Sequence, residues 1–399
     1  MMDEIYLDYQ AAKPIDRRVL DEMIPYFSDI YSNPASLHRS GDIATKKLEE
    51  SREKIAQFIN APDDSSIIFT SSATESNNLA IIGAAQRYKK KGNHIIISEI
   101  EHISIFNICK YLERNGFEIS KIPVDQYGII KIDKLKRLIK ENTIIISIAT
   151  ASNEIGSIQP IKEISKIAQE KKILFHTDAI ANESVIPIDV QDIPVDLLSL
   201  SSNDIYGPKG VAALYIKKGI RVNPIILGGG QEKGFRSGSH NLHGIVGFGK
   251  AAEIMKKEIE SEAKRLEILR DKLIKEVINS IPNSYLNGHP TNRLPNNAHF
   301  RFDFIEGESL ILGLKDQDIA AATGSACSSK TLEPSHTLIS CGLLHEEAHG
   351  SLLISLGRYS TEEDINKFLE ILPKIIKRLR LLSPLTPPEL LKQYNEVNN

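Results

Sequence analysis

The chain has 399 residues, which allows a large core and two domains, and its 41% hydrophobic and 25% charged residues are typical of soluble globular proteins. The net charge of −3 and the lack of a basic block exclude a nucleic-acid footprint, and no apolar run approaches the roughly 20 residues of a membrane span. The three cysteines are far apart and form no Cys-x-x-Cys pair, so we expect a reducing, cytoplasmic setting.

Taken in order, the chain begins with an extended segment and two helical stretches near 17–27 and 43–59. Apolar runs then alternate with helical patterns. The runs lie at 67–69, 95–97, 144–146, 174–175 and 195–200, and the helical patterns near 78–90, 104–113, 132–140 and 161–170. This order predicts an α/β fold with a mostly parallel sheet covered on both faces.

The alternation of apolar runs and helical patterns ends near residue 255. A long charged helix is predicted at 257–279, followed by short strands near 300–304 and 352–356 and a terminal helix at 361–382. The last 15 or so residues contain proline and many polar residues, so we expect partial disorder there. We therefore predict a large domain at 13–255 and a small domain made of 1–12 and 256–399.

Each of the five apolar runs is followed by polar residues. Thr74, His102, Asn153 and Asp178 follow the first four runs, and the stretch from Ser201 to Asp204 follows the fifth. Because the carboxyl ends of parallel strands meet at one edge of a sheet, these residues predict a ligand site at that edge.

The fifth stretch continues as Ile205-Tyr206-Gly207-Pro208-Lys209-Gly210, and regular structure must stop at its Gly-Pro pair. It closely resembles the lysine loop of the NifS/IscS-type cysteine desulfurases, and the likeness extends from Tyr6-Leu7-Asp8 to Ser383-Pro384-Leu385. The resemblance implies an aminotransferase-like fold (the type I pyridoxal-phosphate fold), with a mostly parallel central sheet, a smaller C-terminal α+β domain, and a homodimer.

The chain departs from that family at the residue that defines its chemistry. In the family a His-Lys pair precedes this motif, and the lysine holds the cofactor as a Schiff base. Here the pair reads Asn203-Asp204, and a carboxylate cannot form an imine. Lys209 matches a second lysine of the family, so it is not expected to substitute. A negative charge at Asp204 about 5 Å from the cofactor phosphate would cost ~3 kcal/mol at an effective dielectric constant of ~20.

The resemblance also implies a set of site residues. His102 matches an imidazole that stacks on the cofactor ring, and Asp178 matches the aspartate that keeps the ring nitrogen protonated. Asn33 and Arg358 match groups that hold the amino-acid carboxylate, which suits the planar fork of an arginine. The cofactor-binding set is Ala73, Thr74, Asn153, Asp178, Ser201, Asn203 and Ser239.

Some of these positions have alternative interpretations. Ala73 and Thr74 fall at a helix start, where backbone N–H groups favour the cofactor phosphate, but Ser72 or Thr74 can equally be a plain N-cap. Ser72 and Ala181 replace the family's usual glycine and glutamine. The segment His345-Glu346-Glu347-Ala348-His349 fits a zinc-protease pattern, but glycines bracket it and no sustained helix is predicted.

The segment Gly324-Ser325-Ala326-Cys327-Ser328-Ser329 matches the loop that carries the family's sulfur-accepting cysteine. Its small, polar residues predict an accessible thiol, whereas Cys109 and Cys341 lie in more apolar stretches and are expected to be buried. Cys327 is therefore the catalytic candidate, as a persulfide carrier or as an iron ligand in a [2Fe–2S] cluster shared with an IscU-type scaffold protein.

Two functions follow from the resemblance. In the first, the protein serves iron–sulfur cluster assembly beside a scaffold, with pyridoxal phosphate not covalently bound and catalysis impaired by the loss of the lysine. In the second, it is an active desulfurase that converts L-cysteine to alanine and persulfide sulfur with non-covalently held cofactor.

Overall fold

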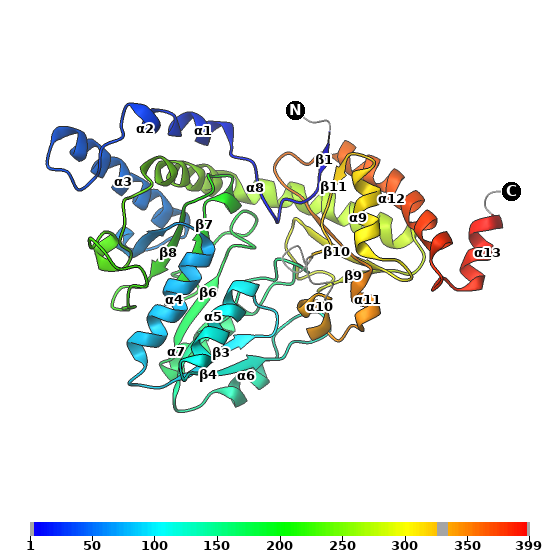
Figure 1. Cartoon of the computed structure of the whole chain (residues 1–399), viewed down its shortest axis with the longest axis horizontal. Coiled ribbons are helices and arrows are strands. Elements are labelled where there is room, and N and C mark those ends of the chain that lie inside the picture. The colour runs from blue at the N-terminus through cyan, green and yellow to red at the C-terminus, as the bar shows by residue number, and fades with distance from the viewer. Residues whose placement is uncertain (1–3, 325–333, 397–399) are drawn as a thin grey trace.

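The structure is a computed structural model that describes residues 4–324 and 334–396, and within these ranges the larger half contains a seven-stranded sheet (Figure 1). The strand order is β2-β8-β7-β6-β5-β3-β4, in which β8 runs antiparallel to β2 and β7 and the other neighbours are parallel. The strands are β2 (Ile67–Thr70), β3 (His94–Ser98), β4 (Glu118–Ile122), β5 (Thr143–Ser147), β6 (Leu174–Asp178), β7 (Leu197–Ser201) and β8 (Ala212–Ile216). The predicted mostly parallel sheet is confirmed.

Helices cover both faces of this sheet, because strand side chains alternate between two cores. Ile67 and Phe69 of β2 point into one core, and Ile68 points into the other. The Ile68 core is closed by α4 (Ala73–Tyr88) and α5 (Ile103–Arg114). The opposite core is closed by α1 (Arg17–Met23), α2 (Pro25–Ser28), α3 (Arg39–Phe58), α6 (Ile132–Leu138), α7 (Ile161–Lys171) and the start of α8 (Leu242–Ser280).

The smaller half has its own core around an antiparallel sheet of order β12-β10-β9. These strands are β9 (Ser284–Asn287), β10 (Asn297–Phe302) and β12 (Ser351–Ser355), packed under α9 (Gly307–Lys315) and α12 (Glu362–Leu382). The chain start joins this half, since β1 (Ile5–Tyr6) pairs in parallel with β11 (Ile319–Ala320). The remaining helices are α10 (His336–Ser340), α11 (His345–His349) and α13 (Pro388–Glu396).

One helix runs from one half into the other (Figure 1). The predicted helix at 257–279 is the second part of α8, which begins at Leu242 and has 39 residues. Its side chains up to Ile259 belong to the large core, and those from Leu266 belong to the small one. A helix thus crosses the proposed limit at residue 255, and the division into 13–255 and 1–12 with 256–399 stays a proposal.

Other expectations meet a mixed outcome. The tail prediction was wrong for residues 388–396, which form α13. The zinc-protease pattern lies on a helix of one turn, α11, and a strand starts two residues later. No helix in the described ranges is long and apolar enough to cross a membrane.

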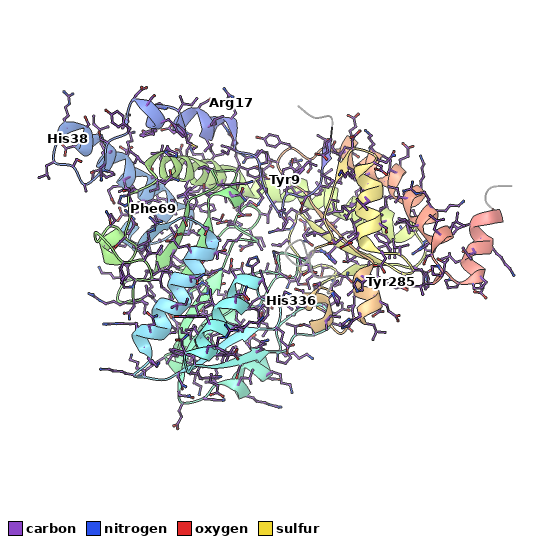
Figure 2. The ribbon with its side chains drawn as sticks, viewed as in Figure 1. Tyr9, Arg17, His38, Phe69, Tyr285 and His336 are labelled. Carbon is purple, nitrogen blue, oxygen red and sulfur yellow. The ribbon has the colours of Figure 1, made fainter. Side chains whose placement is uncertain are left out.

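Tyr9 lies where the two halves meet, between Phe69 of the large sheet and Tyr285 of the small one (Figure 2).

Candidate functional site

A cavity of about 160 Å³ lies at the carboxyl ends of the parallel strands. Thr74 follows β2, His102 follows β3, Asn153 follows β5, Asp178 ends β6, and Asp204 follows β7. The predicted convergence of five strand ends on one site is therefore confirmed. The N-terminal segment adds Gln10 and Ala11 to the wall.

Asp178 is a buried carboxyl group at this cavity, 8% exposed. Asn77 Nδ2 donates to its Oδ2 at 2.8 Å, and the backbone N–H of Ile180 donates to its Oδ1 at 3.1 Å. Burial raises the pKa of Asp178 despite these hydrogen bonds. A cation placed beside this group, such as a protonated ring nitrogen, would stabilise its carboxylate form.

The first turn of α4 forms another part of the wall. Ser72 is the N-cap, as one sequence interpretation proposed, and its Oγ accepts a hydrogen bond from the N–H of Glu75 at 3.1 Å. The N–H groups of Ala73 and Thr74 come earlier in the turn, where no intrahelical acceptor exists. Both residues line the cavity, so the helix start offers donors to an anion there as well as a cap.

His102 reaches the cavity from the start of α5. Its Nδ1 accepts a hydrogen bond from the N–H of Ser104 at 3.2 Å, which makes His102 the N-cap of that helix and fixes its ring. Asn153 and Asn203 also line the cavity. The side-chain oxygens of Asn77 and Asn203 are buried without a hydrogen-bond partner in the described part of the chain, so both can meet a ligand.

Asp204 sits in a short 3₁₀ turn, η2 (Asn203–Ile205), directly after β7. Its carboxylate Oδ1 lies 3.8 Å from Nζ of Lys13, and both side chains are almost fully buried, at 9% and 2% exposure. The sequence interpretation counted the negative charge of Asp204 but did not identify this cation beside it. Lys209 lies exposed beyond Pro208 and does not line the cavity, so the structure does not bring it to the position of a cofactor amine.

Two of the predicted cofactor contacts lie away from the cavity wall. The N–H of Ser201 donates to both carboxylate oxygens of Glu183, at 3.1 and 3.2 Å, and Ser201 does not line the cavity. Ser239 is exposed in the loop between η3 (Glu232–Gly234) and α8. The resemblance assigns that loop to the site of a neighbouring subunit, and this role of Ser239 stays a prediction.

The structure does not bring Arg358 to the cavity either. Its guanidinium forms an ion pair with Asp16, a second one with Glu258 at 2.7 Å, and lies 4.8 Å from the centre of the Tyr206 ring. Asn33 is exposed between α2 and α3, where its side chain accepts the N–H of Ala35. Neither residue lines the cavity, and their assignment as carboxylate ligands stays a prediction.

Cys327 lies outside the described residues, but both flanks of its segment are described. A Cβ atom on Gly324 would lie 3.0 Å from Cγ of Glu154, next to the cavity residue Asn153. On the other side, Nε2 of His336 lies 3.1 Å from the carbonyl oxygen of Glu101, next to His102. The segment that carries Cys327 therefore leaves and rejoins the described chain beside the cavity.

The other two cysteines behave as predicted. Cys109 and Cys341 are buried, and burial raises the pKa of each thiol to about 12. Neither has the thiolate character that a sulfur carrier or metal ligand needs at neutral pH.

The sequence interpretation missed two residues at the back of the cavity, Lys13 and Glu183. Glu183 is fully buried, and burial followed by the nearby charge of Asp204 raises its pKa well above the ordinary value. The sequence offers a weak signal for Glu183 alone, a charged residue within the mostly apolar stretch 179–186, and none for Lys13.

Comparison with known proteins agrees with this geometry. Residues 5–368 match the aminotransferase class-V family, so the chain belongs to that family of the type I pyridoxal-phosphate fold. Cysteine desulfurase IscS 1 of Archaeoglobus fulgidus is 55% identical to it over 380 residues, covering 95% of this chain and 99% of that protein. Cysteine desulfurase IscS of Methanosarcina thermophila is 48% identical over 385 residues, covering 96% and 95%.

Among solved structures, a NifS-like protein superposes with a TM-score of 0.89 at 36% identity, covering 94% of this chain and all of that one. Within the class-V family, the chain is thus a member of the NifS/IscS-type cysteine desulfurases, whose cofactor is pyridoxal phosphate.

The cavity residues fit that cofactor. The N–H groups of Ala73 and Thr74 at the helix start suit its phosphate, Asp178 suits its ring nitrogen, and the unpartnered oxygen of Asn203 suits a ring substituent that donates a hydrogen bond. No lysine lines the cavity among the residues that the structure describes. When bound, pyridoxal phosphate supplies an electron sink to an amino-acid substrate.

Proposed function

We propose that this protein serves iron–sulfur cluster assembly as an IscS-type protein that holds pyridoxal phosphate without a covalent bond and has impaired desulfurase activity. The observation that carries the proposal is Asp204, which stands at the family's lysine position with its carboxylate 3.8 Å from Lys13 Nζ. Among the residues that the structure describes, no lysine lines the cavity. The cavity wall therefore offers no lysine amine to bond the cofactor or to move a substrate proton.

The remaining residues keep binding and orienting roles. The α4 amides at Ala73 and Thr74 bind the phosphate, Asp178 holds a proton on the ring nitrogen, and His102 stacks on the ring. These roles bind the cofactor but leave the proton transfer at the substrate without a base. We therefore expect affinity for pyridoxal phosphate to survive and turnover of L-cysteine to be weak.

Sulfur chemistry falls to Cys327 in this proposal. Its thiol carries persulfide sulfur or completes a [2Fe–2S] cluster held mainly by an IscU-type scaffold protein, since thiolates are the usual cluster ligands. Support comes from the flanks of its segment, which lie beside Asn153 and His102. The setting is cytoplasmic and the assembly a homodimer, as the family resemblance implies.

The test is borohydride reduction of the protein purified with pyridoxal phosphate, followed by peptide mass spectrometry and an absorption spectrum. We expect cofactor absorbance that dialysis removes, and no pyridoxyl group on any lysine. A pyridoxyl adduct on Lys209 would refute non-covalent holding of the cofactor, and steady sulfide release from L-cysteine without any adduct would favour the active desulfurase with non-covalently held cofactor.

A further inference from the structure

Lys13 is a fully enclosed lysine directly behind the cavity wall. Its Nζ donates to the carbonyl oxygen of Asp204 at 2.6 Å and to Oγ of Ser184 at 3.0 Å, and it lies 3.8 Å from the Asp204 carboxylate. The segment is fastened to the same turn a second time, because the N–H of Asp16 donates to the carbonyl oxygen of Tyr206 at 2.9 Å. Lys13 is therefore held against η2 by backbone and side chain together.

The charges around Lys13 explain why an ammonium is placed there. Asp204 lines the cavity, while Glu183 and Ser184 lie behind it, and all three residues are buried. Burial lowers the pKa of Lys13, whereas Asp204 and Glu183 raise it. Removing one partner from a buried ion pair leaves an uncompensated charge, which is far more costly than losing an exposed pair.

The cavity wall itself has no cation to offset this charge. Among the described residues it contains the carboxyl groups of Asp178 and Asp204 and the imidazole of His102, but no lysine or arginine. A ligand with a phosphate group would therefore share this cavity with the Asp204 carboxylate. Lys13 is the described cation in direct contact with Asp204, and it reaches that residue from outside the cavity.

We propose that Lys13 is a positioning residue of the cofactor site, which neutralises Asp204 from behind so that an anionic cofactor can bind, and which makes positions 13 and 204 one charge-complementary pair. This inference rests on the proposed function, because it concerns how pyridoxal phosphate is admitted. It has a consequence for repair of the site. A lysine introduced at position 204 would face the ammonium of Lys13, so Asp204→Lys alone should form a poor covalent site, and Asp204→Lys with Lys13→Met a better one.

The alternative role for Lys13 is that its amine itself bonds the cofactor. The contacts argue against it, because Nζ is directed at the backbone oxygen of Asp204 and at Ser184, and Lys13 does not line the cavity. A lysine that bonded the cofactor would have to leave both acceptors and pass the Asp204 side chain.

The first arm of the test is a double-mutant cycle on pyridoxal phosphate binding, measured by equilibrium dialysis, with pyridoxal as the probe that lacks the phosphate. Lys13→Met should weaken binding of pyridoxal phosphate on the order of tenfold or more, because the Asp204 carboxylate without its cation repels the phosphate. Binding of pyridoxal, which has no phosphate, should weaken much less. Lys13→Met with Asp204→Asn should restore binding to near the wild-type value. The matched control is Lys209→Met, because Lys209 is an exposed lysine in the loop that follows Asp204. This variant should bind both probes as the wild type does.

The second arm measures covalent adducts by borohydride reduction and peptide mass spectrometry in Asp204→Lys, with and without Lys13→Met. The double variant should carry the greater adduct yield at position 204. This comparison of adduct yields also tests the inference if the Lys13→Met single variant does not fold.

The outcomes separate the inference from the proposed function. If the wild type binds pyridoxal phosphate and Lys13→Met binds it equally well, the inference fails and the proposed function stands. If the wild type does not bind it, non-covalent holding fails, and equal adduct yields in the second arm would then overturn the inference as well. A pyridoxyl group on Lys13 in the wild type would overturn the inference directly.

Discussion

A buried ion pair between Arg52 and Glu232 should contribute more to stability than any exposed pair of this protein. Arg52 lies on α3, and its Nη1 and Nη2 contact the two carboxylate oxygens of Glu232 at 2.7 and 2.9 Å. The same carboxylate accepts the backbone N–H of Phe69 at 2.8 Å and lies 2.7 Å from Nε2 of His240. The pair ties the loop that carries Ser239 to the edge strand β2 of the large sheet.

The size of the effect follows from the pKa of Glu232. Burial alone would raise this pKa, but the hydrogen bonds from Arg52 and His240 outweigh burial and lower it from 4.5 to about 2. A depression of this size corresponds to roughly 3 kcal/mol, at about 1.4 kcal/mol per pH unit. Breaking a buried pair from one side costs about 3–5 kcal/mol, so Arg52→Met should lose at least ~3 kcal/mol of unfolding free energy at pH 7.

The pH dependence has a defined sign. Because the folded-state pKa of Glu232 is lowered, its contribution is complete above the unfolded value near 4.5 and is lost as the pH falls towards about 2. The cost of Arg52→Met should therefore shrink between pH 5 and pH 2.5.

The assay is urea unfolding followed by circular dichroism, since the chain contains no tryptophan. Arg39→Met is the matched control, because Arg39 is an exposed arginine on the same helix. Arg52→Met with Glu232→Gln should be less destabilised than Arg52→Met alone. A cost below ~1 kcal/mol at pH 7, the range of exposed pairs, would refute this reasoning.

Three further predictions concern the site. The isolated protein should release sulfide from L-cysteine weakly or not at all in a methylene-blue assay, because no amine stands at position 204. Steady turnover would contradict the inference that the reaction needs an amine there. Asp178→Ala should weaken pyridoxal phosphate binding on the order of tenfold in equilibrium dialysis, because the ring nitrogen loses its counter-ion; unchanged affinity would remove Asp178 from the site. Cys327→Ser should shorten the lifetime of a [2Fe–2S] cluster on an anaerobically co-purified IscU-type scaffold relative to Cys341→Ser, and equal lifetimes would end the cluster-ligand proposal.

The large sheet could be predicted because its central strands are short and apolar and most of them alternate with helices. Two strands escaped this pattern. β4 (EISKI) is an edge strand that is mostly polar and partly exposed, and β8 follows the lysine-loop motif with no α-helix between them. The first half of α8 escaped for a different reason. Gly247 and Gly249 weaken its helical signal, yet a Cβ atom would lie 2.6 Å from Met23 Sδ and 2.8 Å from Ser51, so close helix packing requires them.

The candidate site was predicted where residues follow strands and missed where contacts are distant in sequence. His102, Asn153 and Asp178 each come directly at or after a strand end, and a parallel sheet brings such residues together whatever the loops do. Lys13 is 191 residues from Asp204, and nothing local in either segment reports their contact. Local patterns carry no information on such a pair until the fold closes.

The contact between Lys13 and Asp204 changes the expected effect of an aspartate at the family's lysine position on cofactor binding. The cost of Asp204 to an anionic cofactor, ~3 kcal/mol at about 5 Å and an effective dielectric constant of ~20, assumes that the carboxylate is unpaired. The Lys13 ammonium, at the observed 3.8 Å, makes positions 13 and 204 a nearly neutral ion pair, so an anionic cofactor meets a dipole there instead of a net negative charge and is repelled much less. In our proposal affinity and catalysis are thereby separated, because Lys13 compensates the charge at position 204 but, directed at Ser184 and the Asp204 backbone, does not supply the amine that the chemistry requires. A protein built this way can keep its cofactor while leaving sulfur transfer to a thiol and a partner.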